Sequence, residues 1–175
     1  MGVSQIYWEL IPDTLIITTT EKVGYTSMTR AIKRSPRIPE WEIPNHPAKV
    51  RLYLRHPITR FASAWAFFSD SKYFPADDRK DSPRLALFSI EKFTDKVLDE
   101  GYWNRHWAPQ IAQHKYFDEI YRFENINETW PHGYSYRELG QWNKSKTPKP
   151  EIVYRLDELN DYYSEDLKAW QKATK

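Results

Sequence analysis

The residues best suited to chemistry lie in a short segment that combines one lysine, one glycine and two adjacent hydroxyl groups: Lys22, Gly24, Tyr25, Thr26 and Ser27. Backbone N–H groups at a helix N-terminus, together with a cation and Ser/Thr hydroxyls, can hold a phosphate group. Nucleoside-triphosphate loops carry their lysine after a second glycine, whereas Lys22 precedes the glycine. The segment therefore indicates a phosphate-bearing ligand other than the ATP or GTP of a hydrolase.

A second segment could hold another anion. Arg55 follows a short apolar run, and Arg60 and Ser63 are three residues apart on the helix expected next, so they should share a face. An arginine fork beside a serine hydroxyl suits a second phosphate. The alternative is that both arginines are solvated surface charges. The lysine segment described above favours the phosphate interpretation.

The elements that must position these segments alternate between strands and helices. Short apolar runs predict buried strands over residues 15–19, 50–54 and 119–123. Apolar stripes predict helices over residues 26–35, 57–68, 89–100, 108–114 and 156–170, with loops at 36–48, 70–84 and 131–150. This order predicts an α/β fold with a parallel sheet. Ligands of such folds bind outside the carboxyl ends of the strands, so both segments should face one cleft.

The composition of the chain excludes several classes of protein and of functional site. The chain has 175 residues, 40% of them hydrophobic, which predicts a single domain over residues 1–175. A net charge of +2 and a pI near 8.6 are too mild to indicate a nucleic-acid partner. The absence of cysteine excludes disulfides and cysteine nucleophiles, and the scattered histidines predict no metal site. No signal peptide or apolar run of membrane length is visible, which predicts a cytoplasmic protein without a membrane partner.

Three segments together resemble the motifs of the sulfotransferases that use 3′-phosphoadenosine 5′-phosphosulfate (PAPS), and most of all those of carbohydrate sulfotransferases. The family's P-K-x-G-x-T-S block corresponds to residues 21–27, and its R-D-P-x-x-R-x-x-S block to residues 55–63. Its H-W-x-P-Q block corresponds to residues 106–110, followed by an F-E-N block at 123–125. The motifs occur in the family's order, and the resemblance covers roughly residues 14–170.

The resemblance implies a P-loop-like three-layer domain, with a small parallel sheet flanked by helices, that binds PAPS without a metal and releases adenosine 3′,5′-bisphosphate (PAP). Lys22 would contact the oxygen that bridges phosphate and sulfate. Residues 24–27 would hold the 5′-phosphate, and Arg55 and Ser63 would hold the 3′-phosphate. The predicted reaction is in-line transfer of a sulfuryl group to an acceptor hydroxyl, expected to belong to a carbohydrate.

Transfer to a hydroxyl also needs a base, for which neutral histidine is suited. His106 is the first candidate because it occupies the H-W-x-P-Q position, and the alternative is that it packs locally beside a core Trp107. His46, in the loop between the two phosphate segments, is the second candidate. His56, at the Asp position of the second block, is expected to be structural. Glu124 ends a strand and either points into the cleft or pairs with an arginine.

Departures from the family pattern keep other functions open. Glu21 stands where the family has proline, and it brings a negative charge near an anion site. Tyr25 is large for its position and either crowds the sulfate or lines the acceptor site. A second hypothesis is therefore a nucleotide-binding module that has lost turnover. A kinase-type phosphotransferase is disfavoured by the position of Lys22 and by the lack of an obvious magnesium-binding aspartate. The short chain resembles a minimal microbial or viral version of the family.

Overall fold

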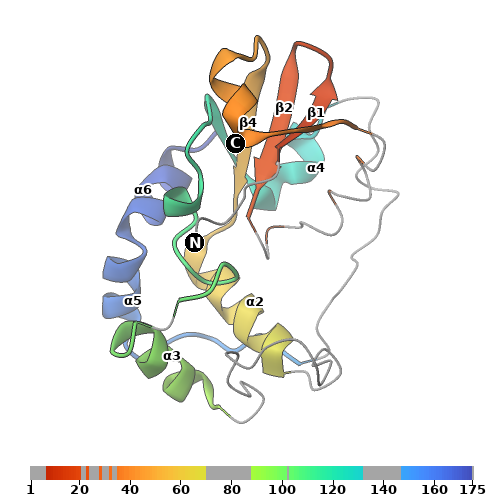
Figure 1. Ribbon diagram of the computed structural model, residues 1–175. Coiled ribbons are helices and arrows are strands. Elements are labelled where there is room, and N and C mark those ends of the chain that lie inside the picture. The colour runs from red at the N-terminus through yellow and green to blue at the C-terminus, as the bar shows by residue number, and fades with distance from the viewer. Residues whose placement is uncertain are drawn as a thin grey trace, which may run out of the picture.

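A computed structural model describes residues 7–20, 23, 28, 32, 35–69, 88–101, 103–131 and 147–174 of the chain. Within these residues one five-stranded sheet forms, with the strand order β3-β1-β2-β4-β5 (Figure 1). Its strands are β1 (Tyr7–Ile11), β2 (Leu15–Thr19), β3 (Arg37–Ile38), β4 (Lys49–Leu54) and β5 (Glu119–Arg122). The strands expected at 15–19, 50–54 and 119–123 are confirmed as β2, β4 and β5, with β4 starting one residue earlier and β5 ending one residue earlier.

The sheet is mixed, which corrects the expectation of a purely parallel one. β2, β4 and β5 are parallel, but β1 pairs antiparallel with both β2 and β3. The β1–β2 connection is a tight turn in which Thr14 N–H donates to the Ile11 carbonyl, and Asp13 has a φ of 51°. β1 has Glu9 at its centre and no long apolar run, so its sequence carries little of the strand signal that β2 carries.

Helices and connecting segments pack on both faces of the sheet, an α/β arrangement that is compatible with a three-layer domain. On one face Ile17 and Tyr53 pack with Met28 and with Ile126 of α4 (Ile126–Thr129). On the other face Ile16 and Val50 pack with residues of η1 (Glu40–Asn45) and of the segment that leads into β5. α6 (Ser164–Lys172) lies against β5.

A further apolar cluster lies beyond one end of the sheet, where α2 (Pro57–Ser69), α3 (Ile90–Leu98) and α5 (Leu156–Tyr162) meet (Figure 1). Phe61 of α2 stacks on Phe93 of α3, with ring centroids 4.8 Å apart. Trp107 packs edge-on against Phe93 and is buried. The Tyr163 hydroxyl donates to the Trp107 carbonyl, so the segment before β5 is anchored inside this helical cluster.

Helix boundaries follow the sequence signals closely at some positions. α2 begins at Pro57 as expected, and the Ser89 hydroxyl caps α3 by accepting from Lys92 N–H. In place of the single helix expected over residues 156–170, two helices form, α5 and α6, with Tyr163 between them. In place of the helix expected at 108–114 a short 3₁₀ turn forms, η4 (Ile111–Gln113), and the loop expected at 36–48 contains β3 and η1.

Some expectations fall partly or wholly outside the described residues. They are the helix at 26–35, the loop at 70–84 and most of the loop at 131–150. In the part of the chain that the structure describes, no helix is both long enough and apolar enough to cross a bilayer.

Candidate functional site at the carboxyl edge of the parallel strands

The candidate site lies where the parallel strands β2, β4 and β5 end, and we call this region the carboxyl edge. Thr19 pairs with Tyr53, so the chain leaves β2 beside the end of β4. Leu54 pairs with Arg122, which brings the residues after β4 beside η5 (Phe123–Asn125). The two predicted phosphate segments therefore begin at neighbouring strand ends, as the alternation of strands and helices in the sequence predicted.

The lysine segment itself lies outside the described residues, apart from Val23. This applies to Lys22, Gly24, Tyr25, Thr26 and Ser27, and also to Glu21. Val23 is buried, its N–H donates to the Thr20 carbonyl at 3.3 Å, and its carbonyl accepts from the Thr19 hydroxyl at 3.3 Å. Val23 thus lies close to the end of β2.

Gln110 joins the two strand ends. Its side chain is fully buried. The Oε1 atom accepts from the Arg55 backbone N–H at 3.1 Å and from the Thr20 hydroxyl at 3.5 Å, and Nε2 donates to the Arg55 carbonyl at 2.8 Å. One amide therefore satisfies both backbone groups of the residue after β4 and also contacts the residue after β2. In the sequence, Gln110 was visible only as the last member of the H-W-x-P-Q block.

Asp166 of α6 holds the backbone of Gln110. Its carboxylate accepts from the backbone N–H groups of Gln110 at 2.6 Å and Ile111 at 2.8 Å. Asp166 is fully buried, and burial raises the pKa of its carboxyl, while these N–H groups and Arg60 oppose that rise. Sequence reasoning missed Asp166, because it stands in the first turn of a helix beside Glu165, where acidic residues are common.

Arg55 and Ser63, the predicted 3′-phosphate ligands, are both half-buried. Arg55 directly precedes α2, and Ser63 lies six residues after Pro57, which is about 9 Å along the helix axis. Burial lowers the pKa of the Arg55 guanidinium, and the negative charge of Glu124 partly offsets this effect.

Arg60 does not share the exposed side of α2 with Ser63, which corrects the sequence interpretation. Its side chain is fully buried. Its guanidinium donates to the Ala108 carbonyl at 2.8 Å and to the Arg105 carbonyl at 2.6 Å. Arg60 therefore attaches the segment before η4 to α2. The more exposed side of α2 instead carries Thr59 and Ser63, four residues apart.

His56, Glu124 and Trp170 form a second polar group at the carboxyl edge. Glu124 accepts from the His56 backbone N–H at 2.9 Å and from the Trp170 indole N–H at 3.0 Å. The His56 ring packs edge-on against the Trp170 ring at 4.8 Å, and its buried Nδ1 has no hydrogen-bond partner. Burial lowers the pKa of His56 and outweighs the opposing effect of Glu124, which favours a neutral ring near pH 7.

His106, the first candidate base, lies in the packed interior. Its side chain is 7% exposed, and its ring packs edge-on against Phe68 with centroids 4.8 Å apart. Its backbone N–H and its Nδ1 both contact Asn104 Oδ1. Phe68 is in the last turn of α2, about 16 Å along the axis from Pro57. The structure therefore does not bring His106 to the carboxyl edge, in agreement with the local-packing alternative.

His46, the second candidate base, lies at the opposite end of the sheet, just before β4 begins. Its Nε2 is 3.5 Å from Glu9 Oε1, and its Nδ1 accepts from the Ala48 N–H at 3.2 Å. With Asp13, these side chains form a group whose possible ligand atoms lie within 4.8 Å of one another. Because Nδ1 accepts a hydrogen bond, the proton of a neutral His46 ring is on Nε2. That tautomer directs a proton, and no lone pair, toward the space between the carboxylates, which disfavours a metal ion there.

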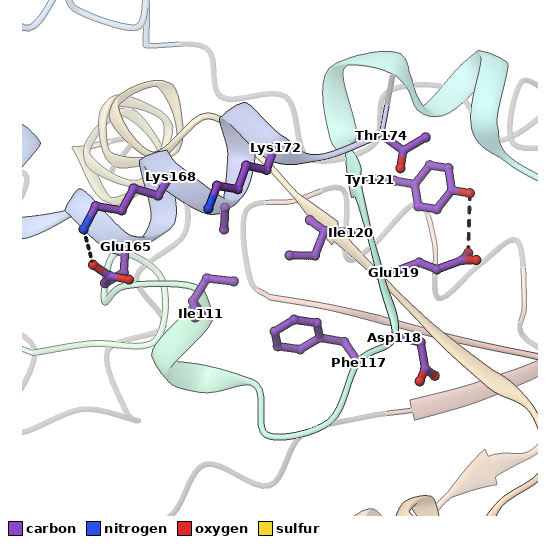
Figure 2. Close-up of a pocket in the computed structure, with 11 residues that line it drawn as sticks. Ile111, Phe117, Asp118, Glu119, Ile120, Tyr121, Glu165, Lys168, Lys172 and Thr174 are labelled. Atoms are coloured by element: carbon purple, nitrogen blue, oxygen red, sulfur yellow. Dashed lines mark hydrogen bonds and ion pairs between the residues drawn. The ribbon is translucent and has the colours of Figure 1, made fainter.

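A separate cleft of about 510 Å³ lies between the outer edge of β5 and α6. Figure 2 shows Ile111, Phe117 and Ile120 in its middle, with Lys168 and Lys172 from α6 on one side. Lys168 pairs with Glu165 at 2.7 Å. Of the predicted site residues that the structure describes, none is among the residues that line this cleft.

No family model, curated protein or solved structure matches the chain. The chemistry of the carboxyl edge therefore has to be inferred from its own residues.

Proposed function

We propose that the carboxyl edge binds PAPS and that the protein transfers the sulfuryl group to an acceptor hydroxyl, which we expect to belong to a carbohydrate. The supporting observation is the double contact of the Gln110 amide with Thr20 and Arg55. These two residues lead into the lysine segment and the arginine segment. A ligand with two separated phosphates would thus meet both segments at one edge of the sheet, where α/β folds bind their ligands.

Each subsite has a distinct task in this proposal. Lys22 and the backbone of residues 24–27 would bind the 5′-phosphosulfate and neutralise the charge that develops as the bond to sulfur breaks. Arg55 and Ser63 would bind the 3′-phosphate through charge-assisted hydrogen bonds. Sulfuryl transfer then resembles phosphoryl transfer, in which positioning and charge stabilisation supply most of the rate.

A nucleotide-binding module without turnover is the second candidate function. It is favoured by the positions of the two candidate bases, since His106 is packed against Phe68 and His46 lies before β4. Among the histidines that the structure describes, His56 is the one at the carboxyl edge, and its ring already packs against Trp170. Both candidate functions predict PAP binding and differ only in sulfuryl transfer.

The test has two stages. Thermal unfolding is first followed with PAP, AMP and ATP, and PAP should raise the melting temperature most, because it alone presents phosphates at both the 3′ and 5′ positions. Labelled sulfate transfer from PAPS to a panel of glycans and small phenols is then measured. Transfer supports the enzyme, and PAP binding without transfer to any acceptor of the panel supports the binding module. Equal shifts with PAP and AMP would remove the 3′-phosphate subsite and with it the proposal.

A further inference from the structure

We propose that Gln110 sets the spacing between the 5′- and 3′-phosphate subsites and is thereby a specificity-determining residue of the carboxyl edge. This inference rests on the proposed function, because it assumes that the two subsites bind one nucleotide. It gives the last residue of the H-W-x-P-Q block a positioning role that does not depend on His106.

The first argument is where the Gln110 amide makes its contacts. Thr20 follows β2 and is the last described residue before the lysine segment, and Arg55 is the first residue of the arginine segment. The same oxygen, Gln110 Oε1, accepts from both of them, at 3.5 Å and 3.1 Å. A shift of Gln110 would therefore change the separation between the starts of the two segments.

The second argument is that the amide has only one favourable orientation. Nε2 faces two acceptors, the Arg55 carbonyl at 2.8 Å and Asp166 Oδ2 at 3.4 Å. Oε1 faces two donors, the Arg55 N–H and the Thr20 hydroxyl. Rotating the amide by a half-turn would place Nε2 against the Arg55 N–H donor, and Oε1 against the Arg55 carbonyl and Asp166 Oδ2 acceptors. Both Gln110 and Asp166 are fully buried, so water does not compete for these groups.

The third argument concerns the ligand. The 3′- and 5′-phosphates of one nucleotide are joined through a ribose ring, so their separation varies over a narrow range. A pre-set distance between the two subsites lets the second phosphate bind without a further ordering cost, and the two contacts then reinforce each other. Loosening the distance should weaken ligands that span both subsites and spare ligands that use only one.

The experiment compares three ligands by isothermal titration calorimetry: PAP, AMP and adenosine 3′-phosphate. Gln110→Met keeps the length of the side chain and removes its hydrogen bonds. We expect PAP affinity to fall by about 10-fold, the scale of one or two net hydrogen bonds, while both monophosphates change by less than about 2-fold. Gln113→Met is the matched control, because the Gln113 amide also bonds to loop carbonyls, those of Ala108 and Pro109, but does not contact a strand end.

A second pair of variants decides the question if Gln110→Met does not fold. Thr20→Val removes the hydroxyl that donates to Gln110 with little change of shape, and Thr20→Ser retains it. We expect Thr20→Val to lower PAP affinity by about 3-fold and Thr20→Ser to restore it. Unchanged PAP affinity in folded Gln110→Met, or in Thr20→Val if Gln110→Met does not fold, would overturn the spacing role, and so would an equal loss for all three ligands. Failure of the unmodified protein to bind PAP more tightly than AMP would instead overturn the proposed function.

Discussion

The two ends of the parallel strands are held by different kinds of contact. At the amino end, β4 starts with hydrogen bonds to nearby loops: Lys49 N–H donates to the Thr14 carbonyl, and Val50 N–H donates to the exposed carboxylate of Asp118. At the carboxyl end, the Arg55 backbone is held by Gln110, and Gln110 by Asp166, 56 positions further along the chain. Gln110 and Asp166 are both fully buried.

This difference in burial predicts that the two ends of the strands respond differently to substitution. A partly exposed hydrogen bond can be replaced by water when it is lost, whereas a buried one leaves its partner unsatisfied. The amino end should therefore tolerate substitution, and the carboxyl end should not. A ligand site benefits from the second arrangement, because buried supports hold the strand ends at fixed positions.

The largest effect is expected from Asp166→Ala, which tests the buried support directly. The substitution leaves the backbone N–H groups of Gln110 and Ile111 without their acceptor, so the free energy of unfolding should fall by about 3 kcal/mol or more. Asp118→Ala at the amino end should cost about 1 kcal/mol. Urea denaturation of both variants measures the difference, and equal losses would show that the two ends do not differ.

Arg55→Ala separates ligand binding from support at the carboxyl end. Gln110 holds the backbone N–H and carbonyl of Arg55, which the substitution retains, so we expect the fold to survive. Binding of PAP should become less favourable by about 1.5–3 kcal/mol, while binding of AMP, which is weaker from the start, should stay almost unchanged. Arg37→Ala, at an exposed position of β3, is the control for loss of one positive charge. Unfolding of Arg55→Ala would mean that the guanidinium is structural.

The pH dependence of stability probes the buried polar groups near the carboxyl half of the sheet. Burial, with a smaller contribution from Arg60, lowers the pKa of His114 from 6.5 to about 3, and the His114 ring contacts the Thr18 hydroxyl at 3.5 Å. The folded pKa lies below the unfolded one, so His114 contributes stability fully above pH 6.5 and loses it as the pH falls toward 3.

Between pH 7 and pH 5 this contribution should fall by about 2 kcal/mol. Urea denaturation at both pH values is compared between the unmodified protein and His114→Gln, whose side chain does not titrate. The pH-dependent loss should be smaller in His114→Gln by that amount. Asp166, whose pKa is raised, titrates in the opposite direction in both proteins and cancels in the difference. Identical pH dependence in the two proteins would mean that burial does not lower the pKa of His114 in the folded protein.

The smallest effect is expected from His46→Ala at the amino end. His46 contacts Glu9 at 3.5 Å and accepts a hydrogen bond from the Ala48 N–H at 3.2 Å, so its loss should lower the free energy of unfolding by about 1 kcal/mol. Neither PAP affinity nor sulfuryl transfer should change, because His46 lies at the amino end of β4, whereas the proposed ligand binds beyond its carboxyl end. Transfer lost in His46→Ala, with PAP affinity intact, would make His46 the base and bring the amino end into the active site.

The sequence by itself determined the elements whose signals are local. Leu15–Thr19 is β-branched and apolar enough to define a buried strand, Pro57 marks the first turn of α2, and Ser89 caps α3. The order of strands and helices was also sufficient to expect that the segments after β2 and β4 would begin at one edge of the sheet. The short strand β1 was not expected, because Glu9 interrupts its apolar pattern.

Only the tertiary structure decided the role of individual polar residues. The H-W-x-P-Q block drew attention to His106, yet His106 packs against Phe68, and Gln110 is the residue that reaches the strand ends. Arg60 likewise has the spacing of a ligand but is buried against loop carbonyls. Whether a polar side chain faces a ligand or the interior depends on contacts with residues tens of positions away along the chain, such as Gln110 with Asp166. Local periodicity carries no information about such contacts.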